Sequence, residues 1–336
     1  MYFLDEIFNN ILNKRRYCKI KKGRKNRMSN IINNFDVGDQ KIYLERAICY
    51  FFDKDNFERL LYASKKAKLD GRKFYVGLYS NDILSKNGQK RIEGITDSDR
   101  IKLVEALDFV DGAIIIDSLK KEDIKRELEN KLLKQKLGEY QNIDKTSEVD
   151  QSKKYEVGYA SGGFDTFHKG HLEHIIEMLK QCKTIIIAVN SDEMLTNGYK
   201  NKKIVNNQET RRLILSHIKG VNIATITDEY DKLKAIDKVR ALCGENFQAI
   251  FVGSDWKGDE RWNEFERKFK ELGIEVIFTD RPKETDLNFV SSSIIREYSS
   301  SKKEQSFPRN PIDVENWRKK LDEERKVIDY RSGSDR

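Results

Sequence analysis

Short apolar runs alternate with segments of helical periodicity through residues 154–298. The apolar runs cover residues 157–160, 185–189, 223–226, 249–252 and 276–278. Apolar residues at helical spacing lie between them, at residues 172–180, 208–218, 230–242 and 261–272. Alternation of this kind is typical of a parallel sheet with helices on both faces, whose ligands bind beyond the carboxyl ends of the strands. The pattern predicts an α/β domain with a doubly wound, Rossmann-like sheet.

The first half of the chain repeats part of this pattern. Residues 48–60, 76–84, 99–104 and 108–114 parallel residues 160–172, 187–195, 210–215 and 219–225 at a nearly constant offset. This predicts two tandem copies of the α/β unit, the alternative being a chance likeness between unrelated strand–helix–strand units. The alignment sets Asn56 against His168 and Arg59 against His171. We therefore expect the first copy to be degenerate, and truncated near Ile116.

These patterns divide the chain into five parts. They are a basic N-terminal tail (1–35), the degenerate copy (36–118), a charged helical linker (119–153), the complete copy (154–298) and a polar C-terminal tail (299–336). The formal net charge is +8, with a basic cluster at residues 14–27. RNA or an anionic membrane surface would attract such a cluster, but charge blocks are more often solvated tails. We favour the solvated tail and expect no nucleic-acid partner.

Composition also bears on location. We find no apolar run long enough to span a bilayer and no apolar core of a signal peptide. Four cysteines, Cys18, Cys49, Cys182 and Cys243, are scattered without a CxxC pair. Reduced thiols in a cytoplasmic protein are the simplest interpretation.

Candidate chemistry is concentrated in residues 162–171, GGFDTFHKGH. An apolar run precedes this stretch and a helical pattern follows it, so a strand turns on glycines into a helix. Helix N-termini expose backbone N–H groups and the positive end of the helix dipole, and so attract phosphate. Three of the four histidines of the chain lie within residues 168–174. The stretch predicts a site for a polyphosphate.

The same stretch resembles the HxGH signature of the nucleotidyltransferase superfamily, and most closely its cytidylyltransferase branch. Further motifs follow in the family's order, at residues 190–193 (NSDE), 200–203 (KNKK), 209–215 (ETRRLIL), 253–258 (GSDWKG) and 290–297 (VSSSIIRE). The GSDWKG segment is most like glycerol-3-phosphate cytidylyltransferases. The resemblance implies transfer of CMP from CTP to a small phosphorylated alcohol, first glycerol 3-phosphate, giving a CDP-alcohol and pyrophosphate.

Other functions stay open at this point. Phosphoethanolamine or phosphocholine would be the acceptor if the tandem copies reflect the ethanolamine-phosphate enzymes. An adenylyltransferase of the same superfamily is the second alternative, because HxGH does not select the base. A nucleotide-sensing scaffold is the alternative outside enzymes. The partners expected are CTP and the phosphorylated alcohol, with either a homodimer or an intramolecular pseudo-dimer.

The resemblance also assigns roles to individual residues. Catalysis would fall to His168, His171, Lys202 and Arg211. The nucleotide would lie against Gly162, Gly163, Phe164, Asp165, Gly170, Gly253, Asp255, Trp256, Arg281, Ser291, Ser292 and Ser293. The acceptor would lie against Asp192, Lys200, Lys203 and Asn222. Mg²⁺ is expected to arrive with CTP, with Asp165 and Asp192 as candidate ligands.

Two departures from the family pattern affect these roles. Arg281 is separated from the serine motif by a longer loop than the family has. Asn222 stands where the family tends to carry an aspartate, which weakens the expectation of glycerol 3-phosphate.

Overall fold

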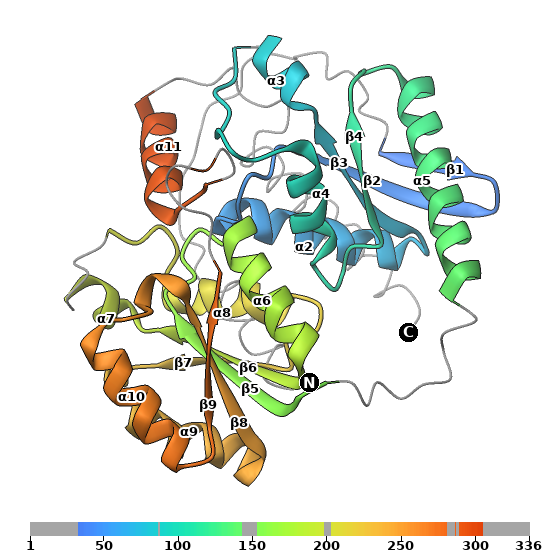
Figure 1. Ribbon diagram of the computed structural model, residues 1–336. Helices are drawn as coiled ribbons and strands as arrows, with labels where there is room; N and C mark the ends of the chain where they lie inside the picture. The colour runs from blue at the N-terminus through green and yellow to red at the C-terminus, as the bar shows by residue number, and fades with distance from the viewer. Residues whose placement is uncertain are drawn as a thin grey trace, which may run out of the picture. The chain divides into compact units, whose positions relative to one another are not determined.

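We describe the fold from a computed structural model, which covers residues 33–86, 88–142, 153–197, 203–280, 286 and 289–304 (Figure 1). The predicted N-terminal tail up to residue 32, the C-terminal tail from residue 305 and part of the predicted linker, residues 143–152, lie outside these described residues. Two sheets are present, one in each half of the described chain. No helix within the described ranges has the length and apolar character needed to cross a membrane.

The N-terminal half, residues 33–142, holds a four-stranded sheet in the order β1-β2-β3-β4. Its strands are β1 (Asn34–Val37), β2 (Gln40–Ala47), β3 (Lys73–Tyr79) and β4 (Gly112–Ile116). Its helices are α2 (Lys54–Leu69), α3 (Asn81–Lys86), α4 (Asp97–Glu105) and α5 (Lys121–Asn142). Strands β2, β3 and β4 are parallel, and β1 pairs antiparallel with β2.

The C-terminal half, residues 153–304, holds five parallel strands in the order β7-β6-β5-β8-β9. The strands are β5 (Tyr155–Gly162), β6 (Cys182–Asn190), β7 (Ile223–Thr227), β8 (Phe247–Gly253) and β9 (Glu275–Thr279). The helices are α6 (Lys169–Gln181), α7 (Asp192–Thr196), α8 (Gln208–Ser216), α9 (Lys232–Cys243), α10 (Glu260–Glu271) and α11 (Ser292–Glu304), with 3₁₀ turns η2 (Gly244–Asn246) and η3 (Ser254–Trp256). The strand order reverses between β5 and β8, so the predicted doubly wound sheet is confirmed, and a ligand is expected at that reversal.

Burial on both faces explains the continuous apolar run of β6. Ile185, Ile187 and Val189 belong to one core, and the intervening Ile186 and Ala188 belong to another. Successive side chains of a strand point to opposite faces, so a strand covered on both sides must be apolar at every position. The core that holds Ile186 and Ala188 also contains residues of α9 and α10, while the other contains residues of α6 and α8.

Helix α5 is part of the N-terminal half and not a free linker. Ile124, Leu128 and Leu132 follow one another at helical spacing and are buried with residues of β1, β2 and β4. The predicted linker of residues 119–153 is therefore shorter than the sequence indicates. At the other end of the complete copy, α11 continues to Glu304, beyond the predicted boundary at 298.

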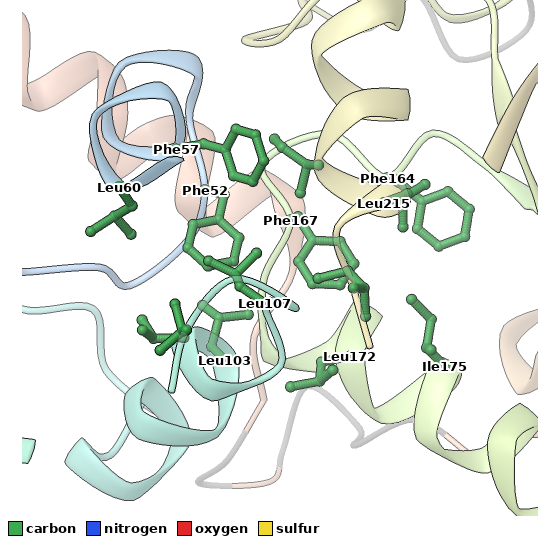
Figure 2. Packing of buried hydrophobic residues seen from close by; sticks show 14 of the residues in the cluster. Phe52, Phe57, Leu60, Leu103, Leu107, Phe164, Phe167, Leu172, Ile175 and Leu215 are labelled. Carbon is green, nitrogen blue, oxygen red and sulfur yellow. The ribbon is translucent and has the colours of Figure 1, made fainter. Parts of the chain in front are cut away.

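One hydrophobic core joins the two halves. Phe52 and Leu103 of the first half belong to the same buried cluster as Phe167 and Leu172 of the second, and Figure 2 shows these side chains packed together. The rings of Phe52 and Phe167 stack with 6.3 Å between centroids. Two isolated backbone bridges cross the contact, Phe52 with Phe167 and Leu107 with Ile218. The halves therefore fold against each other over their most apolar side chains.

The halves also share an order of elements, β2-α2-β3-α3-α4-β4 and β5-α6-β6-α7-α8-β7. This order favours the duplication, which stays a prediction. It also moves the sequence alignment by three residues. Asp53 caps the start of α2 as His168 caps the start of α6, and the preceding residues Phe52 and Phe167 pair in a bridge. Asp53, and not Asn56, therefore occupies the place of His168.

Candidate active site

The turn between β5 and α6 is held in an unusual backbone conformation. Phe164 and Thr166 have positive φ angles of 47° and 50°, a region that residues other than glycine rarely adopt. Each such residue costs on the order of 1–3 kcal/mol and persists only where the surroundings enforce it. The buried Asp165 supplies that enforcement, because its carboxylate accepts hydrogen bonds from the backbone N–H groups of Thr166, Val205 and Asn206 at 2.9–3.0 Å.

His168 caps α6 with its own ring. Its Nδ1 accepts the backbone N–H of Gly170 at 3.1 Å, so Nδ1 carries no proton in that hydrogen bond and the proton of the neutral ring lies on Nε2. Nε2 lies 3.3 Å from the hydroxyl oxygen of Ser292, the first residue of α11. Gly170 leaves room for this ring, since a Cβ there would lie 3.1 Å from His168 Cε1, which is a tight contact. The ring therefore presents an N–H donor toward the start of a second helix.

His171 lies directly beside His168. The ring centroids are 4.0 Å apart and the planes are inclined by 31°. The spacing of three residues places both rings on one side of the first helical turn, at the positive end of the α6 dipole. The two imidazole rings and the positive end of the helix dipole therefore lie at one point, which favours an anion.

Helix α11 approaches this turn with two side chains. Ser292 donates to the backbone oxygen of Asp165 at 3.4 Å, and the guanidinium of Arg296 lies 3.4 Å from the Asp165 carboxylate. Ser291 and Ser293 flank Ser292 at the helix start, and Ser291 Oγ accepts the backbone N–H of Ile294 at 3.4 Å. The serine motif therefore lies next to the histidine turn.

A cavity of about 290 Å³ opens at the carboxyl ends of β5, β6 and β8. Its lining includes several residues predicted from the sequence, namely Gly162, Gly163, Phe164, Asp165, His171, Gly253, Asp255, Trp256 and Ser292. His168 is 4% exposed and does not line the cavity within the described chain, although its neighbour His171 and its partner Ser292 do. The cavity lies where the strand order reverses, as expected for this sheet topology.

Aromatic side chains line one part of the cavity. Trp256 follows β8, and Trp262 and Phe265 lie on α10. The Arg261 guanidinium lies 5.8 Å from the centroid of the Trp256 ring. Flat rings with an adjacent cation are suited to contact a planar ligand group. Trp262, Phe265 and Arg261 carry no family motif, and only their position after GSDWKG in the sequence could have indicated them.

A polar corner of the cavity was missed by the sequence analysis. Lys232, the first residue of α9, donates to the hydroxyl of Ser161 at 2.8 Å, and both line the cavity together with Asn190. The Asn190 Oδ1 is buried and has no hydrogen-bond partner in the part of the chain that the structure describes. Val157 and Tyr159 of β5 and Ile186 and Ala188 of β6 belong to the core that includes α9, so Ser161 and Asn190 continue on that face.

His174 is a second histidine of the cavity lining, beside His171. Its Nδ1 lies 2.7 Å from the hydroxyl oxygen of Thr279, which itself donates to the backbone oxygen of Val252 at 3.2 Å. A hydroxyl has one proton, so Thr279 accepts from His174, and Nδ1 of His174 carries a proton. The spacing of His168, His171 and His174 by three residues could have indicated that His174 lies near the site, because residues three apart are neighbours on a helix.

Arg211 does not face the cavity. It is fully buried, and it donates to the backbone oxygens of Asn206, Gly163 and Asn190 at 2.6–3.0 Å and to Asp192 Oδ1 at 2.6 Å. Neither Arg211 nor Asp192 is among the described residues that line the cavity. The arginine therefore joins the loops that follow β5 and β6, and the expectation that it grips the acceptor phosphate is not supported by its position.

The N-terminal half contains the same arrangement without histidines. Arg100 is fully buried and donates to the backbone oxygens of Ile48 and Tyr79 and to the carboxylate of Asp97. An arginine that recurs where there is no histidine turn is best explained as a support for strand-end loops.

Asn222 lies near the start of β6, at the end of the sheet opposite the cavity. Its amide oxygen accepts the backbone N–H of Ile185, near the start of β6. The cavity lies beyond Asn190, at the opposite end of the same strand. The sequence could not show this, because a motif alignment does not reveal which end of a strand a residue occupies.

The remaining predicted residues give a mixed result. Lys203 is exposed and precedes Ile204, which lines the cavity. Lys200, Lys202 and Arg281 lie outside the described residues. The two candidate metal ligands are already engaged, Asp165 by backbone N–H groups and Arg296, and Asp192 by Arg211. No group of three or more metal-binding side chains occurs among the described residues, so the protein itself offers no complete cage for Mg²⁺ there.

Comparison with known proteins agrees with this geometry. Residues 159–298 match the family described as cytidylyltransferase-like. A FAD synthase of Picrophilus torridus is 31% identical over 137 residues, which cover 41% of this chain and 91% of the relative. The chain belongs to the cytidylyltransferase-like family. The nucleotidyltransferase superfamily predicted from the histidine turn is thus confirmed, and the finer likeness to glycerol-3-phosphate cytidylyltransferases stays a prediction.

Other relatives match a share of this chain of similar size. A FAD synthase of Archaeoglobus fulgidus is 30% identical over 118 residues, covering 35% of this chain and 80% of the relative. The bifunctional protein HldE of Campylobacter concisus is 26% identical over 120 residues, and this chain spans about a quarter of its length, 24%. A solved structure, a lipopolysaccharide core biosynthesis protein from Thermoplasma volcanium, is 27% identical with a TM-score of 0.32, covering 38% of this chain and 97% of that one.

Proposed function

We propose that this family member transfers a nucleoside monophosphate from a nucleoside triphosphate to a small phosphorylated acceptor. An oxygen of the acceptor's phosphate attacks the α-phosphorus, the bond from that phosphorus to the bridging oxygen of the β-phosphate breaks, and pyrophosphate leaves. The observation that carries the proposal is the pair of imidazole rings 4.0 Å apart at the start of α6, beside the cavity.

The histidine turn suits this chemistry because the protein needs to align two reactants and stabilise charge on phosphate oxygens. His168 presents its Nε2–H toward Ser292. A phosphate oxygen in place of the serine hydroxyl would accept a hydrogen bond from that N–H. The positive end of the α6 dipole and the charge of Arg296 lie in the same region. Mg²⁺ bound to the triphosphate would neutralise further charge, and no step above depends on a metal held by the protein.

The nucleotide and the acceptor are the finer part of the proposal. CTP with glycerol 3-phosphate is the first pair, carried by the GSDWKG segment, of which Asp255 and Trp256 line the cavity. Phosphoethanolamine and phosphocholine are alternative acceptors with CTP. The FAD synthase relatives support a second pair, ATP with flavin mononucleotide, since FAD joins an AMP unit to that compound. The aromatic lining formed by Trp256, Trp262 and Phe265 favours this second pair.

We assign the acceptor to the polar corner of the cavity. Lys232 offers a cation for its phosphate, Ser161 a hydroxyl, and Asn190 an acceptor for a hydroxyl or amine hydrogen. These groups lie at the ends of β5 and β6, on the opposite side of β5 from the end of β8 that carries Asp255 and Trp256. This division places the two reactants on either side of the β5 turn.

Pyrophosphate release tests the proposal. The full chain would be incubated with each of CTP, ATP, GTP and UTP against glycerol 3-phosphate, phosphoethanolamine, phosphocholine and flavin mononucleotide, with Mg²⁺. Release with one pair above the no-acceptor control is expected, and Lys232→Met should raise the KM for the acceptor more than that for the nucleotide. Lys234→Met, an exposed lysine on the same helix, is the matched control. Absence of release from every pair would overturn the assignment to nucleotidyl transfer.

A further inference from the structure

The N-terminal half holds the catalytic turn on both sides of His168. On one side, the backbone N–H of Phe52 donates to the backbone oxygen of Phe167 at 2.9 Å. On the other, the Lys169 ammonium donates to the backbone oxygen of Gly94 at 2.5 Å and lies 3.4 Å from the carboxylate of Asp99. The residues immediately before and after the histidine are therefore both fixed by the other half of the chain.

Lys169 is an unusual residue for such a place. It stands between the two histidines of the HKGH motif, and it is 6% exposed. A buried ammonium is costly unless it is paired and hydrogen-bonded, and each of those requirements is met by the N-terminal half. Burial raises the pKa of Asp99, but hydrogen bonds from Thr96 and the charge of Lys169 outweigh it and hold that pKa below its ordinary value. The Asp99 carboxylate therefore stays charged at neutral pH.

Asn206 is a second connection between the halves. Its side chain donates to the backbone oxygen of Phe52 at 3.0 Å and accepts the backbone N–H of Lys54 at 3.0 Å. Its own backbone N–H donates to Asp165, the residue that stabilises the strained turn. The side chain is buried, so these hydrogen bonds are shielded from water. The start of α2 is thus linked through one side chain to the turn before His168.

The N-terminal half also carries helix α11. Val290, Ile295 and Tyr298 are buried in one cluster with Tyr50 and Ile92. The hydroxyl of Tyr298 donates to the backbone oxygen of Lys90 at 2.9 Å. Ser292 and Arg296 belong to the same stretch of α11, so the group opposite His168 is positioned by the same half that positions His168.

We propose that the N-terminal half is a positioning element of the active site, and that Asp99 acts through Lys169 to set the orientation of the two histidines. The inference rests on the proposed function for its kinetic readout. Asp99 would then affect kcat and not substrate binding, which packing between the halves alone does not predict. Asp99 and Lys169 act here as positioning residues, and neither one lines the cavity in the described chain.

Steady-state kinetics with Asp99→Asn and Lys169→Met test this. A displacement of reacting groups by about 1 Å can lower a rate on the order of 10²-fold. Each variant should lower kcat by roughly 10- to 100-fold while KM for both substrates stays within about twofold, and the double variant should be no worse than the poorer single one, because both remove the same interaction. Lys102→Met is the matched control, since this lysine lies on the same helix α4 as Asp99 but is exposed. Its kcat should stay within about twofold.

Two results would overturn the inference. One is a kcat within twofold of the wild type in both variants, and the other is a rise in KM at constant kcat, which would show that Lys169 contacts substrate. Amide hydrogen exchange over residues 163–174 supplies a readout that needs no turnover. Exchange there should quicken in Asp99→Asn and Lys169→Met and not in Lys102→Met. If the wild type releases no pyrophosphate with any pair, the proposed function fails, and unchanged exchange in both variants would then refute the positioning role by itself.

Discussion

Arg211→Met should destabilise the fold more than it harms substrate binding. The wild-type guanidinium is fully buried and donates four hydrogen bonds, three to backbone oxygens and one to Asp192. Methionine keeps the unbranched apolar stem but leaves these acceptors without donors. Each abandoned buried group costs about 1–3 kcal/mol, and breaking a buried ion pair costs about 3–5 kcal/mol in total. We expect the free energy of unfolding to fall by about 3–5 kcal/mol.

Thermal unfolding measures this effect. For domains of 150–250 residues, a loss of 1 kcal/mol in the free energy of unfolding lowers Tm by about 2–4 °C. A decrease of roughly 10 °C is therefore expected for Arg211→Met. The neighbouring Arg212→Met is the matched control, because that side chain is partly exposed and bonds only Glu209 among the contacts described. Its Tm should change by less than about 2 °C, as surface substitutions typically do.

The opposite pattern would refute the reasoning. If Arg211 gripped the acceptor phosphate, Arg211→Met would keep the wild-type Tm and raise the KM for the acceptor alone. Chemical denaturation provides a second check, since the midpoint should fall without a change in the slope m. An unchanged midpoint, together with a raised KM, would restore the role that the family resemblance first implied.

Three further predictions concern catalysis and pH. His168→Ala and His171→Ala should each lower pyrophosphate release by about 10²–10³-fold with the fold intact, as expected for loss of one transition-state donor; near-wild-type release from either would contradict the assignment. Excess chelator should abolish release, and added Mg²⁺ should restore it. Arg59→Ala should leave Glu45 buried without its partner at 3.0 Å. Burial already raises the pKa of Glu45 despite the opposing charge of Arg59. The variant should therefore lose stability as pH rises through the folded-state pKa of Glu45 and regain it in acid. Denaturation series from about pH 5 to pH 8 measure this.

Periodicity predicted the second sheet well because its strands are buried on both faces. A continuous apolar run such as residues 185–189 has few alternatives once helical segments flank it. The histidine turn could also be predicted, because glycines between an apolar run and a helical pattern indicate a strand that turns into a helix. Ser292 followed from its motif, and the structure places it 3.3 Å from His168.

Side-chain direction was beyond the sequence. Arg211 and Arg212 are adjacent and chemically identical, but one is fully buried and the other reaches the surface. The alignment of the two halves failed by three residues for a related reason. Helix α2 has 16 residues and α6 has 13, so a constant offset that fits the later strands cannot also fit the helix starts. Lys232 belongs to no motif, and Asn190 opens the NSDE motif without an assigned role, so their place in the site becomes visible only when the cavity is formed.

The antiparallel strand β1 has a consequence for how many nucleotides the chain can hold. In the C-terminal half, β8 runs parallel beside β5, so both strands deliver their carboxyl ends to one crevice. In the N-terminal half, β1 takes the corresponding position beside β2 but is antiparallel to it. The carboxyl end of β1 therefore lies at the opposite end of the sheet from the carboxyl end of β2. Replacing Asp53 and Asn56 by histidine would restore the letters of the motif without restoring a crevice. Among the described strands there is one such reversal of order, and we expect a binding stoichiometry of one nucleotide per chain.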